Sequence, residues 1–496
     1  MTIGSATARP GRHRSPTPEG AMRATEPSST DAAADGESSK HDSPRPPEAR
    51  TISVVTLGCP KNLADSESML GQLHRAGYRM SGDPAEAELV VVNTCAFLTA
   101  SQEESIATIL EMAKLKETGR LERLVVAGCL AQRHGASLLD EIPEIDFLIG
   151  PGTISQVVDV AAGLLGGGLE RGARLGGLDA IDFDWEPRVI SGSRRTAYLK
   201  ISEGCNNTCT FCIIPQLRGK HRSRSIEDIE REARRLVESG IEELVVIAQD
   251  TTSYGLDLYG KFSLDRLLER LDSIAGVRWI RLLYTYPRYW TDELVACFGR
   301  LERLTLYVDM PIQHASDPVL RRMKRGMGWA RTSDLLQRLR AIPQMVLRST
   351  VITGFPGETE ADVEALLAAL REVEFDHLGA FAYSTEDSTP AGAMEEQLPE
   401  EVRAERRDRV LTQQRAISLR RNRARVRQAV EVLVESVDLE QGMARGRWQG
   451  QAPEIDGETR LVWSAGTPPP AVGEFVPARV RAAGPYDLVA VKEEVR

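Results

Sequence analysis

Three cysteines, Cys205, Cys209 and Cys212, lie close together in the spacing C-x₃-C-x₂-C. A closed zinc site or a four-thiolate cluster needs a fourth ligand. The next cysteine, Cys297, is far downstream in an apolar helical stretch that predicts a core thiol. Three thiolates can instead hold a 4Fe-4S cluster and leave one iron open to an outside ligand. The spacing therefore predicts a reactive iron–sulfur site, and a zinc site with one remote ligand is the alternative.

A second set of cysteines, Cys59, Cys95 and Cys129, is spread over the N-terminal part of the chain. Each follows an apolar stretch that predicts a buried strand; the stretches are 52–57, 88–93 and 124–127, and a fourth is 146–149. Helical patterns separate them, so we expect an open parallel α/β sheet. Such sheets bind ligands at the carboxyl ends of their strands. A lone cysteine there would be a core residue, whereas three in the same topological position predict a second cluster site.

Strand and helix patterns alternate again in the central part of the chain. The expected strands are 196–202, 243–248, 279–284, 305–310, 346–352 and 378–383. Six βα units predict a partial or closed parallel (βα)₆ barrel with its active face at the strand C-termini. The Cys205–Cys212 loop follows the first strand. Gly354 and Gly357 follow the fifth, either as a plain βα turn or to let the backbone approach a ligand.

Three residue pairs have the spacing of helix N-terminal caps. They are Ser101 with Glu104, Ser225 with Asp228, and Thr359 with Asp362. Each pair predicts that a helix begins at that point.

These patterns divide the chain into six segments. Residues 1–50 are rich in Pro, Ser, Ala and charge without apolar periodicity, which predicts a disordered tail. The next four are the N-terminal α/β domain (51–165), a glycine-rich linker (166–193), the barrel (194–397) and a connecting helix (398–428). Residues 429–496 contain short strands separated by Gly and Pro, which predicts a small OB-like β-barrel.

Composition limits the possible functions. A net charge of −10 argues against a protein that coats nucleic acid through bulk electrostatics. Seven cysteines in 496 residues favour metal ligation in a reducing compartment over a disulfide scaffold. The sequence has neither an apolar run of about 18 residues nor a signal-peptide pattern. We therefore expect a cytoplasmic protein without a membrane span, and a monomer.

The Cys205–Cys212 loop at the end of a barrel strand resembles that of the radical S-adenosylmethionine enzymes. In that superfamily the open iron binds the amino and carboxylate groups of S-adenosylmethionine. One electron from the cluster then cleaves the sulfonium to give a 5′-deoxyadenosyl radical. The resemblance implies that Phe211 lies beside the adenine and that the loop of Gly354 and Gly357 lies along the adenosine of the cofactor.

Both cysteine sets, followed by a small β-barrel, resemble the methylthiotransferase family over residues 51–493. The resemblance implies that Cys59, Cys95 and Cys129 hold an auxiliary 4Fe-4S cluster whose open iron carries an exchangeable sulfur species. It also implies that the last domain is a substrate-docking TRAM domain. Two molecules of S-adenosylmethionine would serve one turnover, one as methyl donor and one as radical source. The sequence identifies neither the sulfur donor nor the electron donor.

The family modifies either tRNA adenosines or an aspartate of a ribosomal protein. Cys59-Pro60-Lys61-Asn62 is similar to the ribosomal-protein branch, as are the stretches 93–97, 103–105 and 451–457, whereas the isopentenyladenosine branch has Gln-Met-Asn after the cysteine. From Glu431 to Arg496 there are eleven acidic and seven basic side chains, a net charge of −4 that suits a basic protein partner. The resemblance implies methylthiolation of an aspartate β-carbon in small-subunit ribosomal protein S-twelve, free or within the subunit.

Two alternatives remain. Between Arg415 and Arg427 the chain carries six arginines and no acid, and residues 220–222 are basic as well. The arginines are either a solvated connecting helix or an RNA contact, and the second interpretation keeps a tRNA adenosine methylthiotransferase open. An alternative of another class is a non-catalytic iron–sulfur protein that binds RNA or transfers electrons through closed, four-ligand clusters.

Overall fold

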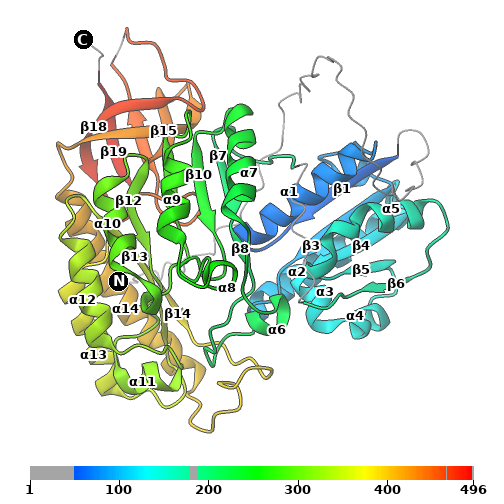
Figure 1. The fold of residues 1–496 in the computed structure, drawn as a ribbon, viewed down its shortest axis with the longest axis horizontal. Coiled ribbons are helices and arrows are strands. Elements are labelled where there is room, and N and C mark those ends of the chain that lie inside the picture. Colours follow the sequence, from blue (N-terminus) through cyan, green and yellow to red (C-terminus); the bar gives the residue numbers. More distant parts are fainter. Residues whose placement is uncertain (1–49, 179–187, 465, 494–496) are drawn as a thin grey trace, which may run out of the picture.

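The computed structural model describes residues 50–178, 188–464 and 466–493 (Figure 1). Nearly all of the predicted N-terminal tail lies outside these residues. The described chain forms a parallel α/β domain, a central domain built on a second parallel sheet, and a closed β-barrel. In Figure 1 the barrel sits on the central domain, away from the N-terminal domain. The predicted fold class is confirmed.

The N-terminal domain contains a six-stranded parallel sheet in the order β2-β1-β3-β4-β5-β6. Its strands are Thr51–Thr56 (β1), Arg79–Met80 (β2), Leu89–Thr94 (β3), Arg123–Gly128 (β4), Phe147–Ile149 (β5) and Gly172–Arg174 (β6). The two edge strands were not predicted, because two or three residues carry too little apolar pattern. β6 lies in the segment predicted as a linker, so the first part of that segment belongs to the sheet.

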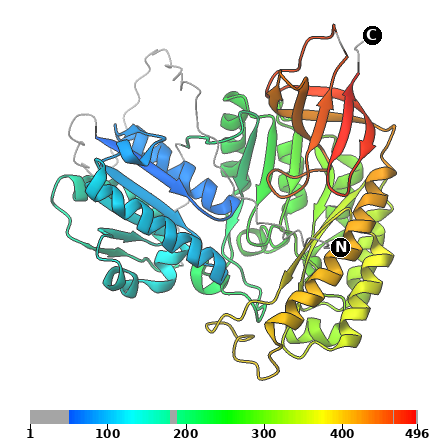
Figure 2. The same ribbon diagram turned by 180° about the vertical axis from the view of Figure 1, so that it is seen from behind.

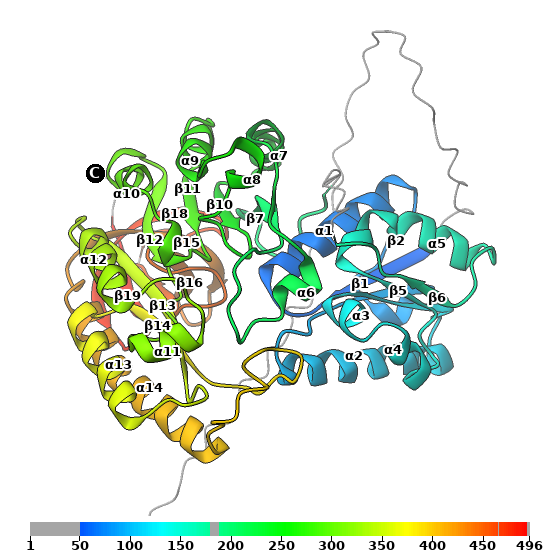
Figure 3. The same cartoon turned by 60° about the horizontal axis from the view of Figure 1, so that its bottom comes forward.

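Helices cover both faces of this sheet (Figure 3). The helices are Pro60–Arg75 (α1), Thr99–Thr118 (α2), Cys129–His134 (α3), Ala136–Glu141 (α4) and Val157–Leu165 (α5). Helices α1 and α5 bury their apolar side chains on one face, and α2, α3 and α4 on the other. The helix start predicted from Ser101 and Glu104 is wrong: α2 begins at Thr99, and no side chain caps it.

The central domain contains a six-stranded parallel sheet in the order β14-β13-β12-β11-β10-β7, which does not close. Its strands are Thr196–Lys200 (β7), Glu243–Ile247 (β10), Trp279–Leu282 (β11), Leu304–Asp309 (β12), Val346–Thr353 (β13) and His377–Ala382 (β14). Leu244 and Val246 of β10 point into the helix-covered core. The alternate residues Val245 and Ile247 point to the opposite face, where the C-terminal barrel packs. The predicted (βα)₆ barrel is therefore the partial form and not the closed one.

Eight helices of the described chain accompany this sheet. They are Ile214–Arg218 (α6), Ile226–Glu238 (α7), Leu256–Tyr259 (α8), Leu264–Asp272 (α9), Asp292–Arg300 (α10), Asp317–Arg322 (α11), Trp329–Arg340 (α12) and Glu360–Val373 (α13). The Ser225 hydroxyl caps α7, and Thr359 with Asp362 forms a reciprocal capping box at α13, as predicted. Cys297 is fully buried in α10, which confirms the predicted core thiol. None of the helices described is long and apolar enough to cross a membrane.

Helix α14, Glu400–Arg423, runs along the central domain into the C-terminal barrel (Figure 2). Barrel strands Ala429–Asp438 (β15), Met443–Trp448 (β16), Thr459–Val462 (β17), Phe475–Ala483 (β18) and Leu488–Lys492 (β19) close in the order β15-β16-β17-β19-β18. Near the end of α14, Arg421 and Arg425 pair with buried Asp376 at 3.0 and 2.6 Å. Arg420 pairs with Glu374 at 2.5 Å. Half of the six arginines therefore hold the helix to the domain, which favours a connecting helix.

Candidate active site

The loop of Cys205, Cys209 and Cys212 leaves the sheet through a tight turn after β7. Strand Ser202–Glu203 (β8) leads into Gly204, whose φ is +78°. A Cβ at Gly204 would lie 2.1 Å from the carbonyl oxygen of Lys220, so only glycine fits. The backbone N–H of Cys205 donates to the Gly219 oxygen at 3.1 Å. These constraints fix the loop at the carboxyl end of the first barrel strand, as predicted.

Nitrogen donors surround two of these thiols. Asn207 Nδ2 lies 3.4 Å from Cys205 Sγ, and Arg325 Nη1 lies 3.5 Å from Cys209 Sγ. Asp250 orients Asn207 by accepting from its Nδ2 at 2.8 Å. Donors aimed at sulfur stabilise thiolate charge and tune a cluster held there. Spacing alone did not predict Asn207 or Arg325 as part of the site.

The environment of these cysteines suits a bound cationic cluster. All seven cysteines of the chain are free of disulfide bonds. Burial raises the pKa of Cys205 to about 11 and that of Cys212 to about 12, so a thiolate at either position needs a cation beside it. A metal ion deprotonates a coordinating thiol outright. The residues present therefore fit an iron–sulfur cluster.

Among residues 50–178, 188–464 and 466–493, no three Cys, His, Asp or Glu side chains converge on the position of a single metal ion. Each thiolate of a 4Fe-4S cluster binds a different iron, so cluster ligands lie wider apart than the ligands of one zinc ion.

The second cysteine set lies at the carboxyl edge of the N-terminal sheet. Cys59 precedes α1, Cys95 follows β3, and Cys129 begins α3 directly after β4. Strands β1, β3 and β4 are neighbours, so the three residues share one edge. A Cβ at Gly58 would lie 2.6 Å from the Cβ of Cys95, which shows how closely the Cys59 turn approaches that residue. Burial raises the pKa of Cys95, and it raises that of Cys129 to about 11.

Arg218 connects the two cysteine sets. It ends α6, the short helix that begins just after Cys212, and it is 2% exposed. Its Nε lies 3.4 Å from Cys129 Sγ, and its other nitrogens donate to Asp65 at 2.8 Å and to Asn62 at 2.6 Å. The chain segment that follows the first set therefore packs directly on the second. No sequence pattern had pointed to Arg218.

Buried charges are paired throughout this interface. Lys200 Nζ lies 2.6 Å from Asp65, and both Lys200 and Arg218 contact Glu203. Burial opposes ionisation of Glu203, but Lys200 and Arg218 outweigh it and hold its pKa at about 2. The N-terminal and central domains therefore meet across a buried surface whose charges compensate one another.

Lys61, the second residue of α1, reaches from the N-terminal domain to the central one. Its Nζ lies 3.3 Å from the centroid of the Tyr284 ring, at the carboxyl end of β11. Burial lowers the pKa of Lys61, and the negative charge of Cys59 and Asp309 acts in the opposite direction. This contact places a basic side chain at the mouth of the central domain.

The residues predicted to contact S-adenosylmethionine lie against other side chains of the chain. Phe211 packs edge-on against Phe355, with ring centroids 6.5 Å apart. A Cβ at Gly354 would lie 2.5 Å from Arg403, and one at Gly357 would overlap Arg322. In this structure the space beside both glycines is therefore filled by the chain's own side chains. The contact of Phe211, Gly354 and Gly357 with the cofactor stays a prediction.

Two other features have structural explanations. His314 is fully buried, accepts from the Ser316 N–H at 2.9 Å and lies 3.3 Å from Glu358, as expected for a structural histidine.

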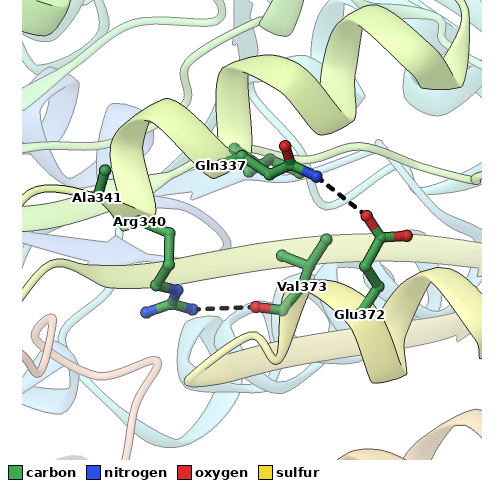
Figure 4. Close-up of a pocket in the computed structure, with 6 residues that line it drawn as sticks. Gln337, Arg340, Ala341, Glu372 and Val373 are labelled. Carbon is green, nitrogen blue, oxygen red and sulfur yellow. Dashed lines mark hydrogen bonds between the residues drawn. The ribbon is translucent and has the colours of Figure 1, made fainter.

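A pocket between α12 and α13 lies on the outer helices (Figure 4). Gln337 on its rim donates to Glu372 at 3.1 Å. Arg340, which also lines it, pairs with Asp376 at 2.8 Å, so the charged groups of this pocket serve the packing of the helices.

Three family profiles match the chain. Residues 51–150 match the uncharacterized protein family UPF0004, residues 199–370 the radical SAM superfamily, and residues 426–492 the TRAM domain. The profiles follow the order of the three folded parts of the structure.

Curated relatives match over most of their length. Two proteins named ribosomal protein uS12 methylthiotransferase RimO are similar to this chain. The one from Desulforamulus reducens is 46% identical over 441 residues, 88% of this chain and 98% of that protein. The one from Desulforudis audaxviator is 48% identical over 449 residues, 90% of this chain and 98% of that protein. The chain belongs to the RimO family of methylthiotransferases. As a RimO-family member it is a radical S-adenosylmethionine enzyme, and the cofactors are S-adenosylmethionine and two 4Fe-4S clusters.

Solved structures support the fold assignment. The radical S-adenosylmethionine methyltransferase TsrM from Kitasatospora setae superposes with a TM-score of 0.53 at 15% identity, over 69% of this chain and 74% of that one. At this identity the likeness concerns the fold alone.

Proposed function

We propose that this chain adds a methylthio group to the β-carbon of an aspartate in ribosomal protein uS12, the S-twelve protein of the small subunit. The curated relatives are named as ribosomal protein uS12 methylthiotransferases, and the aspartate β-carbon is what the family resemblance implies. The structural observation that supports it best is the contact of Arg218 with Cys129 at 3.4 Å. Adding sulfur at an unactivated carbon requires a radical source and a sulfur carrier at one place, and this contact joins the two candidate sites.

The six clustered cysteines have two roles in this proposal. Cys205, Cys209 and Cys212 hold the radical cluster, and Cys59, Cys95 and Cys129 hold the auxiliary cluster. When bound, the clusters and S-adenosylmethionine supply the electron, the radical, the sulfur and the methyl group. We keep Phe211, Gly354 and Gly357 as proposed contacts of S-adenosylmethionine.

The chain's own side chains position and tune this chemistry. Arg325 and Asn207 direct N–H groups at the sulfurs of Cys209 and Cys205, and Arg218 directs one at Cys129. Hydrogen bonds to cluster sulfurs shift the reduction potential and compensate negative charge. The paired charges around Glu203 let charged side chains be buried where the two domains meet.

The net negative charge of the last domain supports uS12 as the substrate less strongly than the count of its charged residues suggested. Glu431 pairs with Arg278 of the central domain, and Asp456 lies 3.4 Å from Arg348. Such acids neutralise neighbouring arginines rather than form a free acidic patch. The preference for uS12 over tRNA therefore rests on the relatives. The exposed arginines Arg415, Arg423 and Arg427 are the feature that favours the tRNA alternative.

The deciding experiment uses the full chain, reconstituted anaerobically with iron and sulfide and reduced with dithionite. It is offered uS12 or tRNA together with S-adenosylmethionine, and mass spectrometry records the methylthio increment. We expect an increment on the uS12 aspartate and none on tRNA. The reverse result would establish the tRNA alternative. Failure to form 5′-deoxyadenosine would point to a non-catalytic iron–sulfur protein.

The cellular setting belongs to the same proposal. We propose that the enzyme acts as a monomer in the cytoplasm, on uS12 either free or within the small ribosomal subunit. Comparing free uS12 with intact subunits as substrates, and measuring the mass of the enzyme in solution, tests both points. A preference of more than about tenfold for one form identifies the natural substrate.

A further inference from the structure

Lys61 lies at the contact between the N-terminal domain and the central domain. It follows Cys59 by two residues, and Pro60 at the start of α1 fixes the backbone between them. Its half-buried side chain crosses to the central domain and rests on the Tyr284 ring, 3.3 Å from the centroid. Tyr284 has a φ of +60°, an uncommon conformation for a residue with a side chain. Its backbone N–H donates to Asp309 at 2.9 Å, which holds the backbone in this conformation.

The acidic side chains near Lys61 already have other partners. Asp309 pairs with Arg348 at 2.7 Å. Glu203 is bound by Lys200 and Arg218. Within the part of the chain that the structure describes, Lys61 has no carboxylate within 4.0 Å and no hydrogen-bond acceptor; its recorded partner is an aromatic ring. An ammonium group on an aromatic face keeps its donors free for an anion.

An aspartate substrate brings such an anion with it. Its reacting β-carbon is bonded directly to the carboxylate carbon, so placing the β-carbon between the cysteine sets also buries the carboxylate. A buried carboxylate needs a cation or several donors to offset the loss of water. Lys61 offers an unpaired cation at this interface, whereas Lys200, Arg218 and Arg348 are committed to carboxylates of the chain.

We propose that the ammonium group of Lys61 binds the side-chain carboxylate of the substrate aspartate. Lys61 thereby selects an acidic residue and holds its β-carbon between the two cysteine sets. This inference rests on the proposed function and deepens it, because it identifies the residue that determines specificity. The Tyr284 ring supports the ammonium group and limits its orientations.

A double-mutant cycle across the enzyme and its substrate tests this contact. The enzyme carries Lys61→Met, which keeps an unbranched side chain of similar length and removes the charge. The substrate is a uS12 peptide with either Asp or Asn at the modified position. For the native enzyme we expect the Asn peptide to lose roughly 30-fold or more in kcat/KM. For Lys61→Met we expect the two peptides to differ by less than about threefold, because the partner of the carboxylate is gone.

Controls separate this role from others. Lys114→Met, on the exposed surface of α2, should keep the native preference for Asp. Iron content and 5′-deoxyadenosine formed without peptide are measured for every variant, and kcat/KM is expressed per iron-loaded enzyme. Tyr284→Leu, which removes the supporting ring, should show a reduced preference and gives a second measurement should the first variant load iron poorly.

Two outcomes would overturn the inference. If Asp→Asn in the peptide lowers kcat/KM by the same factor in the native enzyme and in both variants, Lys61 does not contact the carboxylate. If Lys61→Met changes the electron paramagnetic resonance spectrum of the clusters but keeps the preference for Asp, the lysine serves the cluster instead. Failure of the proposed function has a different signature, since the native enzyme would then modify neither peptide.

Discussion

Arg218 and the six clustered cysteines show what single side chains contribute. The cysteines provide two sets of thiols, but each set alone describes only an iron–sulfur site. Arg218 joins the sets, because one guanidinium contacts Cys129 while its helix continues from the Cys212 loop. On the proposed assignment the reaction depends on both sets, so damage to either one should have a distinct effect.

At the residue scale, we expect Cys209→Ala and Cys95→Ala to separate radical formation from sulfur insertion. Cys209→Ala removes a ligand of the radical cluster, so both 5′-deoxyadenosine and methylthiolated product should be lost. Cys95→Ala damages only the auxiliary cluster, so S-adenosylmethionine should still be cleaved while thiolation is lost. Chromatography of 5′-deoxyadenosine and mass spectrometry of uS12 measure the two products. Native thiolation by Cys95→Ala would remove the auxiliary cluster from the mechanism.

At the scale of elements, backbone turns hold both cysteine sets in place. Gly204 and Gly58 have positive φ, and the space of their missing Cβ atoms is filled by neighbouring atoms. Gly204 is the more demanding position, because the nearest atom is a backbone carbonyl that cannot rotate away. The turn after β8 is therefore as important to the site as the cysteines that follow it.

We expect Gly204→Ala to impair cluster loading. Its Cβ would lie 2.1 Å from the Lys220 oxygen, so the loop must shift. Gly260→Ala is the matched control, since Gly260 has a φ of +70° but no atom within 4 Å of an added Cβ. The control should lose about 1 kcal/mol of stability from backbone strain and keep its iron. Iron per chain after reconstitution and the thermal midpoint distinguish the two variants; equal iron in both would show that the turn is not critical.

At the scale of the whole molecule, the C-terminal barrel closes the open face of the central sheet. Trp448 and Ala452 of the C-terminal barrel pack against the face of the sheet that the helices do not cover, where Tyr307 lies. Arg447 of the barrel reaches Glu243 of β10 at 2.7 Å, and Arg281 reaches the same carboxylate at 2.8 Å. The barrel is thus part of the central core as well as a candidate docking domain.

We expect Glu243→Gln to destabilise the whole chain. It leaves Arg281 buried without a charged partner and leaves Arg447 with Glu435 as its remaining carboxylate; breaking a buried ion pair typically costs about 3–5 kcal/mol. Glu440→Gln, at an exposed acid of the same barrel, should change stability by less than about 0.5 kcal/mol. Urea unfolding followed by circular dichroism measures both. A small effect of Glu243→Gln would mean that the barrel docks mainly through apolar contacts.

The pKa of Glu243 predicts that the free energy of unfolding depends on pH. Burial opposes its ionisation, but Arg447 and Arg281 hold the pKa of Glu243 at about 2, below its ordinary value of 4.5. The folded state therefore binds fewer protons than the unfolded state in this range, and Glu243 stabilises fully above about pH 4.5. That contribution is lost as the pH falls toward 2. The difference in unfolding free energy between native chain and Glu243→Gln should shrink over this window; a constant difference would contradict the assignment.

The sequence by itself determined the elements and the thiols. Strand periodicity and the positions of Cys59, Cys95 and Cys129 after three strands were enough to predict their common edge, because parallel strands end at the same side of a sheet. Strongly periodic segments such as β10 and the capped start of α13 were predictable for the same local reason. Edge strands β2 and β6 were not, since their few residues are set by pairing rather than by pattern.

Only the tertiary structure decided how the domains meet. The contact of Arg218 with Cys129 joins residues far apart in sequence, and so does the contact of Lys61 with Tyr284. Net charge was a poor guide for the same reason: acids of the last domain, such as Glu431, pair with arginines of the central domain. Side chains that act across an interface carry no local pattern, because their partners are chosen by packing. The sequence specified the thiols, and the packing of the domains placed Arg218, which follows the Cys212 loop, against Cys129.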